Sequence, residues 1–595
     1  MDRDLQEKTF TLLLVGEGNF SFSASLCDNS HQHHHITATC YESEDIVRKQ
    51  PPAWSNVQHL RSKGAVVHFG VDATKLHACA FLTDKLYDRI IFNFPHCGRK
   101  AGVKKNRDLL SNFFLSCADV LSPCGEIHVA LCQGQGGTPA DHPRREWHNS
   151  WQVVAMASPA GYILTSVVPF DSDKHYGYQS TGYRSQEKSF HVVGALNHVF
   201  TRSLPLENIT ALQLIDKLTS VQDPKCIEAE EDRGFLGKTS CHPISMLYKE
   251  LIKYCEEKLP VNVIQDHFPI LCGKDTCRLY YVTLSKDKEA SQSSCDKNLH
   301  FHEQNLWSVG SAHASHTPGL YHLRPSLLCF IDDITHKSNP GPGLLTIGSG
   351  LVFRKSLISP RTMPVYHEML MLLGYHENTS KVQLQLLMDT IKYAIESIAA
   401  SIISVDKEKT GYDALGVKFH QKNKDYTIVM TSNCDQIIGD IKVVPPGDQY
   451  KELGVLIVDL NLDLIAMNIL DIQDWRMLWT EDERFIEQFS THHLRTFQNF
   501  SLYPPYYIHD ISFWIDGDSI FDDVEFHTIA LQISKGNIVN IQLLDQYENA
   551  ETGKTGLCYR MTYQSCDRAL SYRSALEMQL LLRDELQRSL QVTLR

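Results

Sequence analysis

Two glycines that flank an acid stand directly after a short apolar run near the start of the chain. The run is Leu12–Val15, and a helix-like segment follows the glycines. A strand, a glycine turn and a helix in this order form the first unit of nucleotide-binding α/β folds, in which glycines let the backbone approach a ligand. A tight turn without a ligand, or a dinucleotide site, requires the same residues. The candidate cofactor contacts here are Gly16, Glu17, Gly18, Asn19 and Phe20.

Polar residues also end the next three β-rich runs, over residues 36–42, 66–72 and 87–96. They are Glu42, Asp72, Asn93 and His96. Because the carboxyl ends of parallel strands meet at one edge of a sheet, we expect these side chains to converge with the glycine turn. An acid after the second strand accepts hydrogen bonds from a ribose, although Glu42 is equally explained as an acid at a helix N-terminus. The sequence predicts a Rossmann-like α/β domain with one ligand pocket.

A basic run follows the last of these strands. Five Lys or Arg residues fall within nine positions: Arg99, Lys100, Lys104, Lys105 and Arg107. At the ligand edge of the sheet, such a run favours contact with a phosphate backbone over a merely solvated face. The loop with Tyr176, Tyr178 and Tyr183 offers rings for stacking on bases, which ordinary loop packing explains equally well. The histidines within 31–35 have no partner motif, so we expect no structural metal.

Three motifs of this region resemble the Rossmann-like methyltransferase family that methylates N3 of a uridine in large-subunit ribosomal RNA. They are Val-Gly-Glu-Gly-Asn-Phe-Ser-Phe at 15–22, Gly-Val-Asp-Ala-Thr-Lys-Leu at 70–76 and Ile-Phe-Asn-Phe-Pro-His at 91–96. The resemblance covers about residues 8–200. It implies that the cofactor is S-adenosylmethionine rather than a dinucleotide.

The same resemblance implies roles for the site residues. Gly16, Gly18 and Asn19 would line the methionine end of the cofactor, Glu42 the ribose and Asp72 the adenine. The implied catalytic residues, which would hold the target base, are Asn93, Pro95 and His96. Such a site must align the methyl group with N3 and exclude water. The N3 proton leaves to His96, or to solvent while Asn93 fixes the base edge. Because pairing hides N3, the substrate base is expected to be unpaired or flipped out.

The length and composition place these motifs in a larger protein. A chain of 595 residues is too long for one hydrophobic core and predicts three or four domains. Hydrophobic residues make up 43% and charged residues 21%, as in soluble globular proteins. No apolar run is long enough to span a membrane. The net charge of −13 argues against non-specific coating of nucleic acid but allows a local basic groove.

Seventeen cysteines are scattered without any Cys-x-x-Cys pair, which favours a reducing compartment. The first residues lack the features of a signal peptide or a mitochondrial presequence. We therefore expect a cytoplasmic protein, with the nucleus or nucleolus as the alternative.

We predict four parts in the chain. A Rossmann-like methyltransferase domain over 1–205 is followed by a helical extension and flexible linker over 206–300. A class II synthetase-like antiparallel domain over 301–495 and a ferredoxin-like domain over 502–595 complete it. The linker prediction rests on the polar stretch Ser285–Ser294.

The third part resembles the catalytic body of phenylalanyl-tRNA synthetases. Residues 348–369 are similar to motif 2 of class II synthetases, with Arg354 retained, and residues 459–472 to motif 3. Motif 3 requires glycines where this chain has Asp459 and Asn461, and an arginine where it has Leu464. That arginine holds the ATP γ-phosphate, a charge-assisted contact that leucine cannot make. We therefore predict a degenerate domain without aminoacylation activity.

The last part has the pattern β-α-β-β-α-β, which is that of the split ferredoxin-like fold. Its motifs closely resemble the ferredoxin-fold anticodon-binding domain of phenylalanyl-tRNA synthetases, which implies contact with a structured RNA. The candidate RNA contacts are Lys554, Arg560, Arg568 and Arg573. However, residues 502–595 hold eight Lys or Arg against thirteen Asp or Glu, so a retained scaffold or protein-docking module is the alternative. Arg560 is equally explained by pairing with a carboxylate inside the fold.

Taken together, the resemblances imply an S-adenosylmethionine-dependent RNA base methyltransferase. Its partner would be RNA, with ribosomal RNA ahead of transfer RNA. The alternative is a non-enzymatic RNA-binding or synthetase-associated scaffold.

Overall fold

The computed structural model describes most of the chain. The described residues are 10–29, 34–98, 102–182, 190–221, 240–264, 268–273, 305–309, 321–338, 341–405, 415–431, 435–447, 453–491, 493–515 and 521–595. The chain divides into two compact units. The first is Met1–Glu207 with two C-terminal segments, Asn499–Ile508 and Tyr563–Gln579, and the second contains the remaining residues. No helix in the described ranges is long and apolar enough to cross a membrane.

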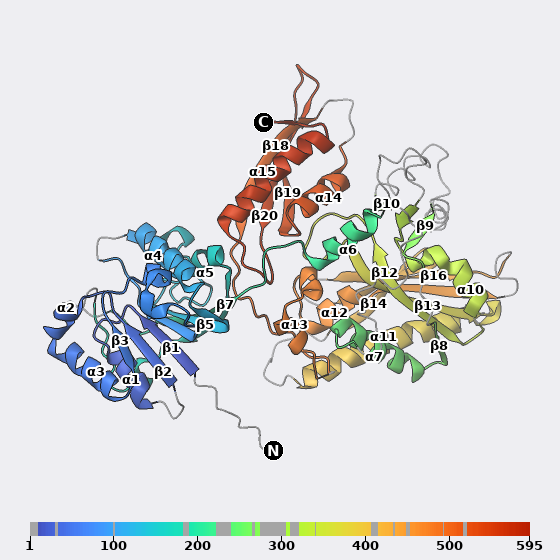
Figure 1. The fold of residues 1–595 in the computed structure, drawn as a ribbon. Helices are drawn as coiled ribbons and strands as arrows, with labels where there is room; N and C mark the ends of the chain where they lie inside the picture. The colour runs from blue at the N-terminus through green and yellow to red at the C-terminus, as the bar shows by residue number, and fades with distance from the viewer. Residues whose placement is uncertain are drawn as a thin grey trace. The chain divides into compact units, whose positions relative to one another are not determined.

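A seven-stranded sheet forms the centre of the first unit (Figure 1). Its strands are β1 (Phe10–Val15), β2 (His34–Thr39), β3 (Val66–His68), β4 (Tyr87–Asn93), β5 (Leu121–Leu131), β6 (Tyr162–Pro169) and β7 (Leu196–Arg202). Their order is β3-β2-β1-β4-β5-β7-β6. Strands β1 to β5 pair in parallel, whereas β7 is antiparallel to both of its neighbours. The predicted α/β class is confirmed, and the order places β1 and β4 side by side at the centre.

Helices cover both faces of this sheet (Figure 1). They are α1 (Ser21–Asn29), α2 (Glu44–Arg48), α3 (Pro51–Ser62), α4 (Gly102–Cys117) and α5 (Val153–Ala157). Leu12 and Leu14 of β1 pack in one hydrophobic cluster with α1 and α3. Leu13 and Val15 pack in the other, with α4 and α5. Because both faces of the strand are buried, its sequence is continuously apolar rather than alternating.

Strand β7 is the element of this unit that the sequence analysis missed. Its residues, Leu-Asn-His-Val-Phe-Thr-Arg, alternate only weakly between polar and apolar types. His198 is nevertheless buried, between β5 and β6, which flank β7. A strand inserted between two others accepts polar residues because its backbone pairs on both edges, and no periodicity marks it in the sequence.

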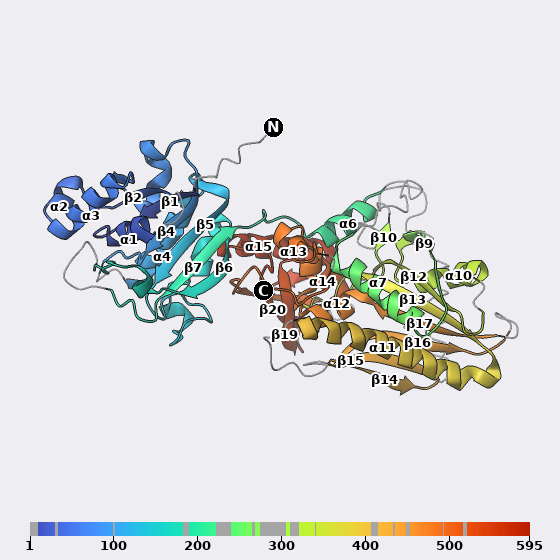
Figure 2. The ribbon, with the colours of Figure 1, turned by 90° about the horizontal axis from the view of Figure 1, so that it is seen from below.

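The second unit contains another seven-stranded sheet, of order β14-β15-β16-β17-β13-β12-β8. Its strands are β8 (Val261–Val263), β12 (Leu345–Phe353), β13 (Val365–Tyr375), β14 (Gly416–Lys422), β15 (Asp425–Thr431), β16 (Gln436–Val444) and β17 (Gly454–Asn461). All neighbours are antiparallel except β12 and β8. Helices α7 (Pro243–Glu256) and α11 (Ser380–Val405) pack together along the sheet (Figure 2).

This sheet corrects one part of the predicted organisation. Strand β8 lies within 206–300, which was predicted to be an extension and linker, yet it pairs with β12 and so belongs to the synthetase-like body. Helix α7 belongs there too, whereas α6 (Thr210–Thr219) precedes it in the chain. The polar stretch Ser285–Ser294 lies outside the described residues.

Smaller elements complete the second unit. A three-stranded sheet has the order β10-β11-β9. These elements are β9 (Leu271–Gly273), β10 (Ser308–Val309), β11 (Tyr321–Leu323), α10 (Ile331–Ser338), α12 (Leu462–Leu470) and α13 (Glu483–Glu487).

The C-terminal module has the predicted order of strands and helices. The elements are β18 (Tyr507–Ile515), α14 (Asp523–Ile533), β19 (Ile538–Glu548), β20 (Thr555–Tyr563), α15 (Tyr572–Ser589) and β21 (Thr593–Leu594). They form a four-stranded sheet of order β19-β20-β18-β21. This is the split ferredoxin-like fold, so the prediction is confirmed.

Candidate active site

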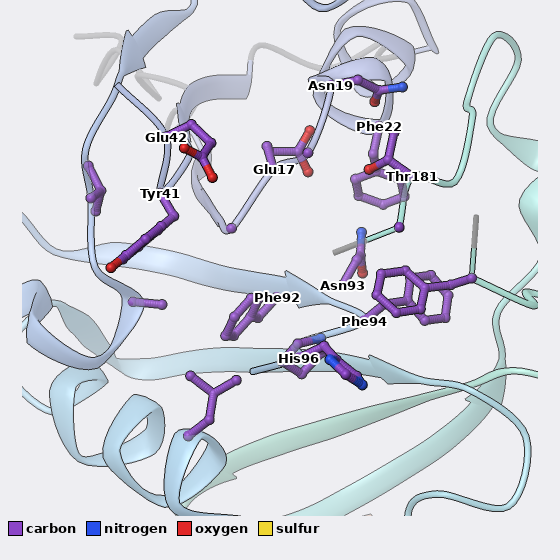
Figure 3. Close-up of a pocket in the computed structure, with 18 of the residues that line it drawn as sticks. Glu17, Asn19, Phe22, Tyr41, Glu42, Phe92, Asn93, Phe94, His96 and Thr181 are labelled. Atoms are coloured by element: carbon purple, nitrogen blue, oxygen red, sulfur yellow. The ribbon is translucent and has the colours of Figure 1, made fainter. Parts of the chain in front are cut away.

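A cavity of about 320 Å³ opens at the carboxyl edge of β1, β2 and β4 (Figure 3). Of the predicted cofactor and catalytic residues, those that line it are Gly16, Glu17, Gly18, Asn19, Glu42, Asp72, Asn93, Pro95 and His96. These positions span eighty residues of sequence. Their convergence follows from the sheet order, because β2 and β4 flank β1 and all three run in the same direction.

Gly16 is required by the turn that opens the cavity. Its φ is +68°, a conformation that side chains other than glycine rarely adopt. A Cβ at this position would lie 2.4 Å from Cε2 of Phe92. The glycine therefore lets the turn approach the end of β4, where the predicted catalytic residues begin.

Phe20 does not line the cavity. Its side chain is fully buried in the cluster with α1 and α3, and its ring lies 5.9 Å from that of Phe69. Its φ of +59° is unusual for a bulky residue. Phe20 therefore anchors the turn from below, and its predicted role as a direct cofactor contact is corrected.

Asn19 and Ser21 hold a second segment over the cavity. The Asn19 carbonyl oxygen accepts from the Ser21 amide at 3.1 Å and from its hydroxyl at 2.8 Å, and the Asn19 amide nitrogen donates to the Gln179 carbonyl. The Gln179 N–H donates to Ser21 Oγ at 2.9 Å. This fastens the segment 178–182 to the glycine turn, and Tyr178, Gln179, Thr181 and Gly182 line the cavity from it.

Glu17 carries an acid into the same cavity. Its Oε2 accepts from the Ser23 N–H at 3.2 Å, in the first turn of α1. Burial raises the pKa of Glu17 to about 7, and this hydrogen bond opposes the rise only in part.

Two further acids lie toward the opposite end. Asp72 Oδ1 accepts from the Thr74 N–H at 2.9 Å and the Thr74 hydroxyl at 2.7 Å, which fixes the carboxylate as a cap of the short helix Ala73–Ala78. Glu42 lies ahead of α2, and its backbone carbonyl accepts from the Gly70 N–H. Figure 3 shows the Glu42 side chain next to Tyr41. The side-chain oxygens at this end suit the hydroxyl and amino groups of a nucleoside.

Asn93 lies at the end of β4, with the other polar end of the cavity around it. Its amide nitrogen is buried and has no hydrogen-bond partner among the residues that the structure describes. A buried N–H group without a partner is energetically unfavourable, so it marks a position for a ligand acceptor. Phe94 follows with φ +51°, and its ring stacks on Phe190 at 5.9 Å.

His96 is oriented by a backbone group of its own loop. The Gly98 N–H donates to Nδ1 at 2.7 Å, so the neutral ring carries its proton on Nε2. Burial lowers the pKa of His96, which keeps the ring neutral. In this tautomer Nε2 is a donor, so the geometry does not favour His96 as the acceptor of the N3 proton.

Several lining residues were not predicted, namely Phe22, Tyr41, Val71, Ala73, Phe92, Phe94, Cys97, Leu109, Gln179, Thr181, Gly182 and Phe190. Tyr41 directly precedes Glu42, so its neighbour in sequence was the available signal. The residues around 179–182 and Phe190 come from the connection between β6 and β7, where no motif spacing points to the site.

Comparison with known proteins agrees with this geometry. Residues 13–182 match the family described as rRNA (uridine-N3-)-methyltransferase BTM5-like, and residues 501–595 match the ferredoxin-fold anticodon-binding domain. The human ferredoxin-fold anticodon-binding domain-containing protein 1 is 42% identical over 620 residues, covering 98% of this chain and 99% of its own. The chain belongs to the family of that protein. Both terminal resemblances found in the sequence are thereby confirmed.

The synthetase-like features have relatives of their own. The chloroplastic/mitochondrial phenylalanine–tRNA ligase of Arabidopsis thaliana is 38% identical over 137 residues, covering 23% of this chain and 31% of its own. Among solved structures, pyrrolysyl-tRNA synthetase from Desulfitobacterium hafniense aligns with 43% of this chain and 79% of its own, at 10% identity. Its TM-score of 0.28 is too low to support an argument.

The basic run of this family member has mixed roles. Lys104 and Lys105 are exposed in the first turns of α4. Arg107 instead donates to backbone carbonyls of Trp147, His148 and Ser150, with distances from 2.6 to 3.2 Å. It stabilises that loop, so its prediction as an RNA contact is corrected. Arg99, Lys100 and the residues 183–184 lie outside the described residues.

In the C-terminal module, the predicted RNA contacts separate in the same way. Arg568 is 6% exposed and donates to the carbonyls of Pro205 and Glu207, so its role is structural and that prediction is corrected. Arg560 pairs with Asp510 through two contacts of 2.9 and 2.8 Å, as the alternative interpretation held. Arg573 is largely exposed beside Glu577, and Lys554 lies in the turn before β20.

The synthetase-like body uses its motif residues within the fold. Arg354 donates to the Pro325 carbonyl at 2.7 Å and lies 3.7 Å from the buried carboxylate of Glu368. Asn461 caps α12 by accepting from the Leu464 N–H, and burial near Glu368 raises the pKa of Asp459 to about 7. Each of these contacts replaces an interaction that the nucleotide would require.

Proposed function

We propose that this chain is an S-adenosylmethionine-dependent methyltransferase that acts on N3 of a uridine in RNA, with ribosomal RNA as the first substrate to test. The observation that carries the proposal is the charge of the cavity. Three carboxylates line it, from Glu17, Glu42 and Asp72, and the described lining residues include no Lys or Arg. The family match supports the same reaction class.

The charge favours this cofactor over a dinucleotide. A pyrophosphate would meet carboxylates without a cationic partner, which is unfavourable in a cavity that is partly desolvated. S-adenosylmethionine carries an ammonium and a sulfonium group, and its adenosine offers hydroxyl and amino donors to Glu42 and Asp72. When bound, it supplies an activated methyl group.

The remaining chemistry belongs to residues at the end of β4. Loss of the N3 proton from uracil spreads negative charge onto the two flanking carbonyl oxygens. The amide nitrogen of Asn93 is placed to donate to one of these oxygens, because it is buried at the cavity without a partner in the described structure. His96 is a donor at Nε2 and stabilises the same charge, while the proton leaves to water or to an acid of the cavity. Donors set in advance toward developing charge lower the barrier.

Aromatic side chains shape the place for the base. The ring of Phe94 stacks on Phe190, and Phe22 and Tyr178 meet edge to face at 5.6 Å. Such a wall offers stacking to an extruded base and excludes water from the methyl transfer.

Two measurements on the full chain test the proposal. Titration calorimetry is expected to detect binding of S-adenosylmethionine, and the variant Asp72→Asn is expected to weaken it. Modification mapping of ribosomal and transfer RNA, with and without the protein, is expected to reveal one methylated uridine. A folded chain that binds no S-adenosylmethionine would contradict the function.

The non-enzymatic scaffold remains a second candidate because Arg560 is neutralised by Asp510 and the C-terminal module is acidic. Crosslinking and sequencing of bound RNA separates the two. Uridine-containing ribosomal RNA loops support the enzyme, whereas transfer RNA with no lost modification in its absence supports the scaffold.

Aminoacylation is not part of the proposed function. With Leu464 in place of the phosphate-binding arginine and Arg354 held near Glu368, ATP–pyrophosphate exchange with phenylalanine is expected to stay at background. Exchange above background would contradict this assignment.

A further inference from the structure

The carboxyl group of Glu17 has no counter-charge among the described residues that line the cavity. Its Oε2 accepts one backbone N–H, from Ser23, and the other charged lining residues are the acids Glu42 and Asp72. A carboxylate removed from water is unfavourable unless a positive charge is brought to it. The geometry therefore points to a cationic group in the ligand itself.

Figure 3 shows where along the cavity this charge is needed. Glu17 lies between two groups of side chains, with Tyr41 and Glu42 on one side and Asn93 and His96 on the other. In the proposed reaction the adenosine occupies the first end and the target base the second. The sulfur that delivers the methyl group must lie between them, which is the position of Glu17.

We propose that Glu17 distinguishes the methyl donor from its demethylated product by pairing with the positive charge of the sulfonium. This inference rests on the proposed function, because it assigns S-adenosylmethionine to the cavity. The product S-adenosylhomocysteine keeps the adenosine and the ammonium but has a neutral thioether at the same position. Since an ion pair is stronger in a desolvated cavity than in water, loss of the sulfonium charge weakens binding and promotes product release.

The pairing predicts a pH dependence of donor binding. Burial raises the pKa of Glu17 to about 7 in the ligand-free protein, and a bound cation favours the ionised carboxylate. Below about pH 7, binding must therefore release a proton from Glu17, and the affinity should rise with pH by up to about tenfold per unit. Above the pKa, Glu17 is already ionised and the affinity should level off.

The other titratable groups around Glu17 do not produce this pattern. Burial raises the pKa of Cys40 to about 12 and raises the pKa of Tyr178 still further, so both stay neutral in this range. Burial lowers the pKa of His96, so its ring stays neutral as well. Glu42 and Asp72 lie toward the nucleoside end, where donor and product are chemically identical.

The test is titration calorimetry of the full chain with S-adenosylmethionine and S-adenosylhomocysteine between about pH 6 and about pH 8. Buffers of different ionisation enthalpy measure the protons released. Wild type should bind the donor with proton release below pH 7 and bind the product with less. Glu17→Gln should weaken the donor about tenfold or more, change the product little, and abolish the excess proton release. The matched control Glu42→Gln removes an acid from the same cavity and should weaken both ligands alike.

The outcomes separate this inference from the proposed function. A wild-type chain that binds the donor without a pH-dependent proton release overturns the role of Glu17 and leaves the function standing. Equal weakening of donor and product by Glu17→Gln overturns it too, because the residue then recognises a group that both share. A folded wild-type chain that binds neither ligand overturns the proposed function together with the inference.

Discussion

Gly16 shows how a single residue sets the geometry of the site. Its backbone has φ +68° and a Cβ would lie 2.4 Å from the Phe92 ring. The substitution Gly16→Ala therefore combines backbone strain with a clash, and should destabilise the N-terminal domain by about 2–4 kcal/mol. It should also abolish the rise in melting temperature that S-adenosylmethionine causes. Thermal unfolding with and without the ligand measures both effects.

Gly70 provides the matched control for Gly16. Its φ is +67°, but no atom lies within 4 Å of the position of a Cβ. Gly70→Ala should thus carry only the backbone strain, about 1 kcal/mol, and keep the thermal shift with S-adenosylmethionine. If both variants lose the shift equally, the contact between Gly16 and Phe92 is not what shapes the cavity.

Glu17 should reduce the stability of the ligand-free protein at neutral and alkaline pH. Its pKa is raised from 4.5 to about 7, so the folded chain holds a proton that the unfolded chain releases in this range. Stability is therefore lost as pH rises from about 4.5 to about 7, by roughly 2–3 kcal/mol in total. Glu17→Gln should melt at a higher temperature than wild type at pH 8, with the difference shrinking toward pH 5.

Ligand should reverse that order. With saturating S-adenosylmethionine, wild type should gain stability by mass action and the variant should gain less. A variant that is less stable than wild type without ligand at pH 8 would contradict the argument, since removing an unbalanced buried charge cannot then be the main effect. Functional sites commonly keep such destabilising groups.

Among the elements, the strands of the first sheet were predictable and their cap of loops was not. The runs at 12–15 and 87–93 are continuously apolar because both faces of β1 and β4 are buried. Strand β7 carries polar residues and gave no periodic signal. The polar residues after the strands were predictable as one site because parallel topology brings strand ends together. Nothing local showed that Phe20 packs on Phe69.

The segment 178–182 is the element that most depends on contacts distant in sequence. Ser21 accepts from the Gln179 N–H at 2.9 Å and Asn19 donates to the Gln179 carbonyl. Ser21→Ala should release this segment, because it removes hydrogen bonds that no residue of the segment replaces. Hydrogen exchange of residues around 176–182 should accelerate about tenfold, with the melting temperature lowered by only a few degrees.

Ser25→Ala is the control for that prediction. Ser25 lies on the same helix, and its hydroxyl donates to the Phe22 carbonyl within α1. It should leave exchange in the segment unchanged. Faster exchange in both variants would mean that α1 as a whole, rather than the contact with Gln179, holds the segment.

For the whole molecule, composition limits how RNA is bound. A net charge of −13 leaves little general attraction to a phosphate backbone, so contacts must be local. Side chains that looked basic in the sequence are partly used inside the fold, since Arg107 and Arg568 bond to backbone carbonyls and Arg560 pairs with Asp510. Their partners lie 37 or more positions away, which is why sequence alone could not exclude them.

Lys104 and Lys105 are therefore the basic residues of the described structure whose position best suits RNA at the cavity. They are exposed on the first turns of α4, which follows the Asn93–His96 loop. Each phosphate contact releases a counterion, with a slope of about 0.7 per contact for single strands in the salt dependence of affinity. Lys104→Ala with Lys105→Ala should weaken RNA binding and lower that slope by about 1.4. The control pair Lys418→Ala with Lys422→Ala removes exposed lysines from β14 and should leave the slope unchanged. If the control pair lowers the slope as much as the first pair, RNA contacts the synthetase-like sheet as well, and the cavity edge is not the main site of phosphate binding.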